Sequence, residues 1–485
     1  MPSETTANTA VTTHTSVVNG KSFDYTATVG ETVMPDASGN PGATVFSFAY
    51  TKDGEDPATR PVLFIFNGGP GGSTLYFHFG GFGPVRAEVP SDFTGLHAPY
   101  RSLPNEETLL DVADLVFIDP PGTGFARLLA EDQAPNYLGV NQDAVLLSSF
   151  IRRWLSVHGR WSSPKFLMGE SYGALRVAVL ARELMGSVGA GMLRGAALNG
   201  VIVIGQAMNM GSTHSELRYA MNLPTMAAIA WHNRKVKRES RQLADVLSEA
   251  QSFVTSEYVS ALYLGVRLPE AQKTEISRRL EELTGIAAAT WFDAGLRIDA
   301  KTFSETLLSA ERKLISVYDG RYSQPVQPHV LDPVADDPML THAAVACHVA
   351  LQQQLSGPLN YRSSEEYQLI NFKTNAVWDW KQTEVGAPVY LDVGPTLAAS
   401  LNRNPGMHLF VGSGAFDLVT PWGSANHLVT RKEFPQERVT HKTYPSGHCP
   451  YIGADERTAI AADLREFIRQ ASSSPVEGKH DHTLP

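Results

Sequence analysis

The chain has 485 residues, enough for about three domains or for one large α/β domain with an insertion. Acidic residues outnumber basic ones by 50 to 40, and a net charge of −10 supports neither a nucleic-acid partner nor binding to an anionic membrane. Two cysteines exclude a disulfide framework and a cysteine-rich zinc module.

The N-terminal segment carries no recognisable secretory signal. Residues 1–16 are rich in Thr and Ala and lack the apolar segment of about 7 to 15 residues that such a signal needs. No stretch approaches the roughly 18 apolar residues of a membrane span, and no Asn-x-Ser/Thr glycosylation acceptor occurs. We therefore expect a cytoplasmic protein.

Short apolar runs predict the strands. Alternating apolar and polar residues over Lys21 to Val29 and Ala43 to Thr51 predict an antiparallel hairpin. Five further runs are largely apolar, as strands covered on both faces must be: Pro61 to Phe66, Leu115 to Ile118, Phe166 to Met168, Ala197 to Ile204 and His408 to Val411.

Helical stretches lie between several of these strands, such as Gln142 to Val157 and Ala174 to Met185. Alternating strands and helices predict an α/β fold with a mostly parallel central sheet flanked by helices on both faces. Residues 17–205 and 385–472 would form this core. We expect residues 1–16 and 473–485 to lack ordered structure.

The middle of the chain has a different character. Helical periodicity dominates residues 206–384, most clearly over Arg238 to Leu262 and Pro269 to Leu283. Since the sheet resumes near His408, we interpret this block as a helical lid insertion packed over the carboxyl edge of the sheet.

The sequence contains one G-x-S-x-G pattern, Gly169 to Gly173. It follows an apolar strand and precedes a helix, which is the context in which this motif forces a nucleophilic serine into a strained turn. Ser171 is therefore the predicted nucleophile, although a simple Gly-Ser turn is the alternative.

A serine hydroxyl needs a base that takes its proton. In this architecture the acid and the histidine follow the serine in chain order. Asp417 lies just after the strand that ends near Gly414, and His448 lies after the last strand-like segment. We predict that Asp417 orients His448 and that His448 activates Ser171.

Acyl transfer also needs two N–H donors for the developing oxyanion. One should be the amide of Tyr172, directly after the nucleophile. The glycine-rich loop that starts at Asn67 follows an early strand, and we predict the amide of Gly69 as the second donor.

Four motifs together resemble the serine carboxypeptidase family of α/β-hydrolases. They are Asn67-Gly68-Gly69-Pro70-Gly71, Asp119 to Phe125, the Gly169 to Gly173 elbow, and Gly447-His448 followed by Pro450-Tyr451. The resemblance implies cleavage of single residues from the carboxyl end of peptides through an acyl-enzyme. It also implies that Asn67, the Gly68 amide and Glu170 bind the substrate's terminal carboxylate, and that Cys449 lines the leaving-group pocket.

The sequence departs from the family at one position of the carboxylate site. In the family a second Glu shares a proton with the elbow Glu, but Gly81 stands at this place here. His78 or Arg86 could supply the missing donor. A serine-type carboxypeptidase is therefore the first hypothesis. An esterase, amidase or acyltransferase with the same triad is the second, and a catalytically silent binding protein is the third.

The expected partner is a peptide or a small acyl substrate, with neither nucleic acid nor membrane. No metal or organic cofactor is implied. A homodimer is left open by the sequence.

Overall fold

The computed structural model describes residues 8–36, 38–89, 97–187, 192–209, 215–237, 240–326, 332, 334–381 and 391–473. Its centre is a nine-stranded sheet, in which six neighbouring strands, from β7 to β15, run parallel. The order across the sheet is β1 (Thr9–Val18), β2 (Lys21–Pro35), β3 (Pro41–Lys52), β7 (Asp114–Asp119), β4 (Val62–Phe66), β8 (Lys165–Ser171), β11 (Gly200–Gln206), β14 (His408–Gly414) and β15 (Val439–Tyr444).

Both faces of the sheet are covered, which explains the nearly continuous apolar strands. In β4, Leu63 and Ile65 face one hydrophobic cluster, and Phe64 and Phe66 face the other. The first face packs against η1 (Tyr76–Phe82, a π-helix), α10 (Pro338–Ser356) and α14 (Ala454–Ser472). The second packs against α2 (Val140–Val157), α3 (Tyr172–Met185), α12 (Gly394–Arg403) and α13 (Trp422–Val429). The predicted fold class is therefore confirmed, as are the hairpin and the five further strands.

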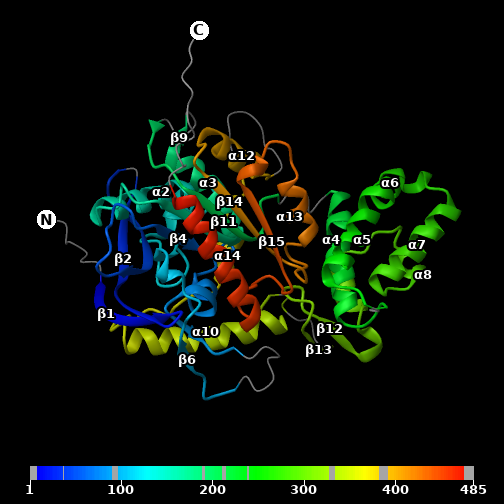
Figure 1. Ribbon diagram of the computed structural model, residues 1–485, viewed down its shortest axis with the longest axis horizontal. Helices are drawn as coiled ribbons and strands as arrows, with labels where there is room; N and C mark the ends of the chain where they lie inside the picture. The colour runs from blue at the N-terminus through cyan, green and yellow to red at the C-terminus, as the bar shows by residue number, and fades with distance from the viewer. Residues whose placement is uncertain are drawn as a thin grey trace, which may run out of the picture.

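The insertion forms a helical unit beside the sheet (Figure 1). It has its own hydrophobic cluster, which also takes in Ala415, Phe416 and Leu418 from the loop after β14. Its helices are α4 (Leu217–His232), α5 (Leu243–Phe253), η5 (Val254–Tyr258), α6 (Val259–Leu264), η6 (Gly265–Arg267), α7 (Glu270–Thr284), α8 (Ala288–Asp293), α9 (Ala300–Thr306) and η7 (Ser309–Glu311). A short hairpin follows, with strands β12 (Lys313–Ile315) and β13 (Ser323–Pro325).

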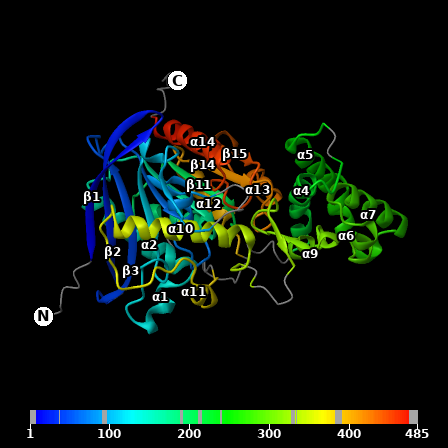
Figure 2. The ribbon, with the colours of Figure 1, turned by 90° about the horizontal axis from the view of Figure 1, so that it is seen from below.

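Two boundary predictions were wrong. Residues 9–16 were expected to lack structure but form most of β1, because their alternating side chains pair with β2 along the whole strand. Residues 206–384 were assigned to the lid as one block, but α10 lies along the core and not with the helical unit (Figure 2). Its small residues Ala343, Ala346 and Ala350 are buried and allow the helix to approach the sheet side closely. The tail beyond residue 473 lies outside the described residues.

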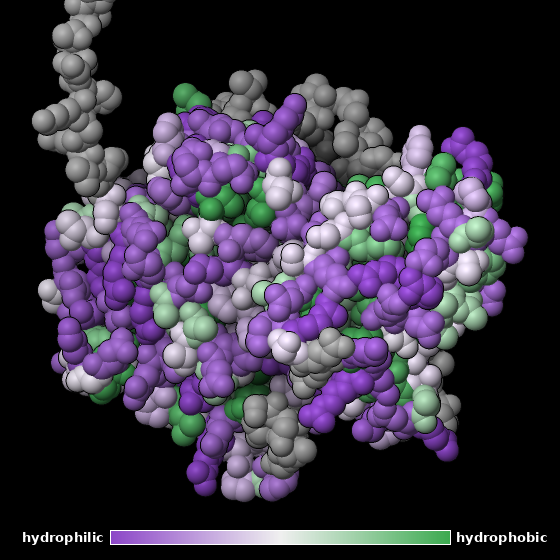
Figure 3. Space-filling view, turned by 45° about the vertical axis from the view of Figure 1, so that its right-hand side comes forward, coloured by the Kyte–Doolittle hydropathy of each residue, from purple (hydrophilic) through white to green (hydrophobic). Residues whose placement is uncertain are grey.

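Short elements complete the chain: β5 (Val85–Ala87), β6 (Ser102–Pro104), η2 (Leu109–Asp111), η3 (Glu131–Gln133), α1 (Ala134–Tyr137), β9 (Gly186–Ser187), β10 (Met192–Leu193), α11 (Phe372–Ala376) and η8 (Gln436–Arg438). Within the described ranges, no helix combines the length and apolar character needed to cross a bilayer. On the face shown in Figure 3, hydrophilic residues predominate and hydrophobic ones are scattered.

Candidate active site

Ser171 lies at the junction between β8 and α3, with φ of 57° and ψ of −124°. A non-glycine residue rarely adopts this conformation, so the surrounding packing must enforce it. The flanking glycines show how. A Cβ at Gly169 would lie 2.0 Å from the carbonyl oxygen of Gly173, and a Cβ at Gly173 would lie 2.7 Å from that of Phe66. Only glycine at both positions lets the turn close this tightly.

His448 and Asp417 come from the loops after β15 and β14. Their side chains meet, with Nδ1 of His448 2.8 Å from Oδ2 of Asp417. The Asp417 carboxylate is itself held by the amides of Val419 and Thr420, at 2.8 and 3.0 Å, and by the Thr420 hydroxyl. Both side chains are buried. The pair is therefore fixed in a single arrangement with little contact with water.

The environment of His448 changes its basicity. Burial by itself would lower the pKa of the imidazole. The charge and hydrogen bond of Asp417 outweigh this effect and raise the pKa of His448 to about 9, with a further contribution from Glu170. The imidazole is therefore a stronger base than an isolated histidine.

A bulge in β11 makes room for this histidine. The pairing of β11 with β8 shifts register between Ile204 and Gln206, and Gly205 has φ of +51°. A Cβ at Gly205 would lie 3.1 Å from Nδ1 of His448. The bulge thus lets the sheet edge approach the imidazole without a side chain between them.

A cavity of about 260 Å³ joins the predicted site residues. Among the predicted triad, oxyanion and substrate-binding residues, Asp417 alone does not line it, because this carboxylate lies behind His448. Much of the remaining wall is apolar, and it includes Tyr76, Tyr318, Val334, Leu340, Leu369, Ile370, Phe372, Trp380 and Val419. Such a cavity suits an organic substrate with a few fixed polar contacts.

The glycine-rich loop lies directly against the elbow. A Cβ at Gly68 would lie 2.7 Å from Cβ of Ser171 and 2.8 Å from the nitrogen of Tyr172. Gly69 has φ of +109°. This backbone geometry brings the two amides predicted as oxyanion donors, those of Gly69 and Tyr172, to the same wall of the cavity as Ser171. Their role stays a prediction.

Asn67 and Glu170 form a buried polar cluster at this wall. The side-chain amide of Asn67 donates to Oε2 of Glu170, and the Asn67 oxygen accepts from the amide of Phe77 at 3.0 Å. Tyr451 completes the cluster, since its hydroxyl donates to Oε1 of Glu170 at 2.7 Å. Tyr451 was not among the site residues predicted from the sequence.

The profile of the serine carboxypeptidase family matches residues 36–467. The chain belongs to this family. Among its curated relatives is serine carboxypeptidase-like 20 of Arabidopsis thaliana, 28% identical over 140 residues, which are 28% of this chain and 27% of that protein. Serine carboxypeptidase 1 of Hordeum vulgare is 27% identical over 150 residues, 30% of this chain and 28% of that protein. These alignments span under a third of each relative.

The prohormone-processing carboxypeptidase Kex1(delta)p of Saccharomyces cerevisiae has a similar fold. Its structure matches with a TM-score of 0.58 at 12% identity and covers 92% of both chains. At this level of identity, the similarity of this serine carboxypeptidase family member to a solved carboxypeptidase is one of fold.

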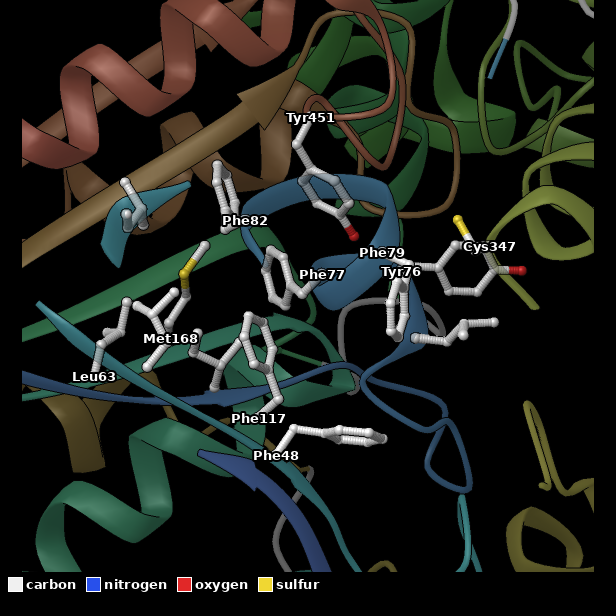
Figure 4. Packing of buried hydrophobic residues seen from close by; sticks show 14 of the residues in the cluster. Phe48, Leu63, Tyr76, Phe77, Phe79, Phe82, Phe117, Met168, Cys347 and Tyr451 are labelled. Atoms are coloured by element: carbon white, nitrogen blue, oxygen red, sulfur yellow. The ribbon is translucent and has the colours of Figure 1, made fainter. Parts of the chain in front are cut away.

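The position of the missing family Glu is filled by Tyr451. A Cβ at Gly81 would lie 2.8 Å from Cδ2 of Tyr451 and 3.1 Å from its Cγ. The Tyr451 ring packs against Phe77 and Phe82 of η1, with ring centroids 4.8 and 5.5 Å apart (Figure 4). Glycine at position 81 therefore creates the space for the ring whose hydroxyl contacts Glu170.

Neither replacement donor proposed from the sequence reaches the cavity. His78 is buried in the core, where its Nε2 lies 2.8 Å from the Tyr50 hydroxyl and its ring stacks on Phe117. Burial lowers the pKa of His78 well below its usual value, so this imidazole is neutral. Arg86 lies in β5, which pairs with β6, and its guanidinium contacts the carbonyl of Ala87. These two predictions were wrong because η1 and β5 direct both residues away from the cavity.

Cys449 lines the cavity as predicted, and it is not paired with Cys347. Burial raises the pKa of the Cys449 thiol well above its usual value, and the charge of Glu170 acts in the same direction. The thiol is therefore neutral and a weak nucleophile.

Aromatic residues of the insertion form part of the site that sequence reasoning missed. Trp378 donates from Nε1 to the Tyr172 hydroxyl at 3.0 Å, and the ring of Trp380 stands perpendicular to that of Tyr172. Tryptophans two positions apart in a long loop carry no sequence signal for this contact. Among the residues that the structure describes, no group of three or more His, Cys, Asp or Glu side chains could hold a metal ion.

Proposed function

We propose that this chain is a serine carboxypeptidase-like hydrolase that cleaves a peptide or peptide-like substrate at its carboxyl end. The observation that carries the proposal is the buried pair of His448 and Asp417, 2.8 Å apart, beside a cavity that Ser171 also lines. Family membership and the strained backbone of Ser171 support the same conclusion.

In the proposed reaction, Oγ of Ser171 bonds to the substrate's carbonyl carbon while its proton passes to Nε2 of His448. The amides of Gly69 and Tyr172 stabilise the resulting oxyanion. Collapse of the tetrahedral intermediate expels the leaving amine, which takes the proton from His448, and leaves an acyl-enzyme. A water molecule then gives a proton to His448 and attacks this ester. As the C–O bond to Ser171 breaks and the acid is released, His448 returns the proton to Oγ of Ser171.

The leaving group would carry the substrate's free carboxylate, and we propose that Asn67, the Gly68 amide and Glu170 bind it beside Cys449. Burial raises the pKa of Glu170, although the nearby His448 and the hydrogen bonds from Tyr451, Cys449 and Asn67 oppose this effect. A protonated Glu170 can donate a hydrogen bond to a carboxylate, whereas an ionised one repels it. Free-acid substrates should therefore bind best below the pKa of Glu170.

One observation favours the alternative of an esterase, amidase or acyltransferase. Asn67 and Tyr451 both donate hydrogen bonds to Glu170. These bonds stabilise an ionised Glu170 without any contact from a substrate. At a pH where Glu170 is ionised and His448 is active, an uncharged ester or amide would be the better substrate.

The decisive experiment compares three substrates: a blocked dipeptide with a free carboxylate, its carboxyl-terminal amide and a simple ester. Assays from about pH 4 to pH 10 cover the titration of carboxyl and imidazole groups. Ser171→Ala serves as the blank. Faster cleavage of the free acid than of the amide supports the carboxypeptidase. Turnover of the ester and amide with an inert free acid supports the alternative.

A fluorophosphonate probe tests the third hypothesis from the sequence, a silent binding protein. An active triad should be labelled at Ser171, and Ser171→Ala should not react. A wild-type chain that binds peptide but is not labelled by the probe at any pH would instead show that the protein is a catalytically inactive binding protein.

A further inference from the structure

A loop of the insertion reaches between the two loops that carry Asp417 and His448. Residues 316–322 connect β12 to β13, and the amide of Ser316 donates to the carbonyl of Tyr322 at 2.9 Å, which closes the base of this loop. Figure 1 shows β12 and β13 between the helical unit and the core. We call residues 316–322 the hairpin loop.

The hairpin loop first holds the segment that carries Asp417. The amide of Leu418 donates to the carbonyl of Val317 at 3.0 Å, and the amide of Gly320 donates to the carbonyl of Phe416 at 2.9 Å. These hydrogen bonds flank Asp417 on both sides. The backbone around the acid is therefore paired with the insertion as well as with the sheet.

The same loop also holds the segment that carries His448. The amide of His448 donates to the carbonyl of Tyr318 at 2.7 Å, and the amide of Gly447 donates to Oδ2 of Asp319 at 3.0 Å. A Cβ at Gly447 would lie 2.3 Å from the carbonyl oxygen of Tyr318. Gly447, next to the catalytic histidine, is thus explained by close contact with the hairpin loop.

An ion pair between a buried carboxylate and a partly exposed guanidinium stabilises this contact. Asp319 is 2% exposed and pairs with Arg321 at 2.7 Å. Arg321 also donates to the carbonyl of Pro445 at 2.8 Å and pairs with Glu456 at the start of α14. The two side chains therefore hold residues 445–447 directly before His448. Loss of the Arg321 charge would leave the buried Asp319 carboxylate without its counterion.

The hairpin loop is anchored at its other side to α10. Ser316 is fully buried, and its hydroxyl donates to Oδ1 of Asp337 at 2.8 Å. Asp337 is also the N-cap of α10, where it accepts from the amides of Met339 and Leu340. Since α10 is packed on the core, the hydrogen bond from Ser316 to Asp337 attaches the hairpin loop to the core as well as to the helical unit.

We propose that Asp319 and Arg321 are positioning residues of the triad, and that the insertion sets the distance between Asp417 and His448 through the hairpin loop. The inference rests on the proposed function. The loops that carry the acid and the base meet where the amide of Phe416 donates to the carbonyl of Ser446 at 2.9 Å. The hairpin loop adds hydrogen bonds to the main chain of both loops nearer the two side chains, at Leu418 and His448. Because a misplacement of about 1 Å in a catalytic group can cost about 100-fold in rate, loss of this connection should reduce kcat.

The test uses the full chain with Asp319→Ala, Asp319→Asn and Arg321→Lys. We expect Asp319→Ala to lower kcat for a simple ester by about 100-fold with KM within about twofold, because substrate contacts are intact. Asp319→Asn keeps an oxygen that can accept from the Gly447 amide, so its kcat should fall less than that of Asp319→Ala. Arg321→Lys keeps the charge but loses the planar guanidinium that donates to the carbonyl of Pro445, so its loss of kcat should lie between those of the two Asp319 variants. The rate of fluorophosphonate labelling at Ser171 should fall in parallel.

Asp111→Ala is the matched control. Asp111 pairs with Arg465, whose guanidinium also donates to main-chain carbonyls, but this pair lies away from the cavity. It should lower thermal stability and leave kcat per folded molecule unchanged. Rates are normalised to folded protein, so a variant that only unfolds is not counted as slow.

A kcat within twofold of wild type for Asp319→Ala or, if that variant does not fold, for both Asp319→Asn and Arg321→Lys would overturn the inference while leaving the proposed function intact. An equal loss in Asp111→Ala would have the same consequence. A wild-type chain that neither turns over the ester nor reacts with the probe would overturn both.

Discussion

The hydroxyl of Tyr451 donates a hydrogen bond of 2.7 Å to Oε1 of Glu170, from a position 281 residues further along the chain. Burial raises the pKa of the Tyr451 phenol well above its usual value, so it keeps its proton at neutral pH. The partner of Glu170 is therefore a permanent donor and not a second titrating carboxyl.

Tyr451→Phe removes this donor with little change in shape. The Tyr451 hydrogen bond lowers the pKa of Glu170, so its loss should keep Glu170 protonated to a higher pH. At a pH where wild-type Glu170 is ionised, we therefore expect KM for a free-acid substrate to fall by up to about tenfold, since such a hydrogen bond is worth about 1–3 kcal/mol. The ester should be nearly unaffected. Steady-state kinetics on both substrates measure the ratio. Tyr444→Phe is the control, because the Tyr444 hydroxyl also donates to a carboxylate, that of Asp463, and does not line the cavity. Equal effects on acid and ester would contradict a role in carboxylate recognition.

Gly81→Ala should destabilise the protein. The new methyl group would lie 2.8 Å from the Tyr451 ring, and overpacking of this kind costs about 1–3 kcal/mol. Thermal or denaturant unfolding measures the change. In the Tyr451→Ala background the same substitution should cost much less, because the clashing ring is absent. Additive costs in the double variant would show that the two residues do not compete for the same space.

The activity toward an ester should increase with pH. Only neutral His448 can accept the Ser171 proton, and Asp417 raises the pKa of His448 to about 9 against the effect of burial. We expect kcat/KM to rise with an apparent pKa near 9. Asp417→Asn should move this value down toward that of an ordinary histidine and lower kcat by about 10⁴-fold. An unchanged apparent pKa in Asp417→Asn would show that the pH dependence of kcat/KM does not arise from His448.

The same pKa has a consequence for stability. A group whose pKa is higher in the folded than in the unfolded protein stabilises the fold when protonated. The contribution of His448 is complete below its unfolded value of 6.5 and is lost as the pH rises through about 9. The free energy of unfolding should therefore fall between these values, and His448→Gln should show a smaller fall over the same interval. Denaturant titrations at a series of pH values measure both slopes.

Ser171→Gly should abolish turnover and stabilise the fold. A φ of 57° destabilises the folded protein by about 1 kcal/mol when the residue is serine, and glycine adopts this conformation without that strain. Ser171→Ala is the matched control, since it also removes the hydroxyl but keeps the Cβ and its strain. We expect Ser171→Gly to unfold at a higher denaturant concentration than Ser171→Ala. The reverse order would indicate that the elbow is not strained.

Local patterns in the sequence determined most of the fold and the central chemistry. The apolar runs predicted the strands of the core because a strand covered on both faces must be apolar throughout, as β4 and β8 are. The G-x-S-x-G elbow placed Ser171 because its constraints are local, arising from Gly169 and Gly173 within one turn. Chain order then selected Asp417 and His448 as its partners.

Contacts between distant segments were decided only by the tertiary structure. His78 and Arg86 are close to the site in sequence, but η1 and β5 turn them away, whereas Tyr451 reaches Glu170 across the sheet edge. The hairpin loop reaches the triad through main-chain hydrogen bonds, which any residue type can make. A sequence records side-chain identity and local periodicity, and it holds no comparable record of which backbone groups meet when the chain folds.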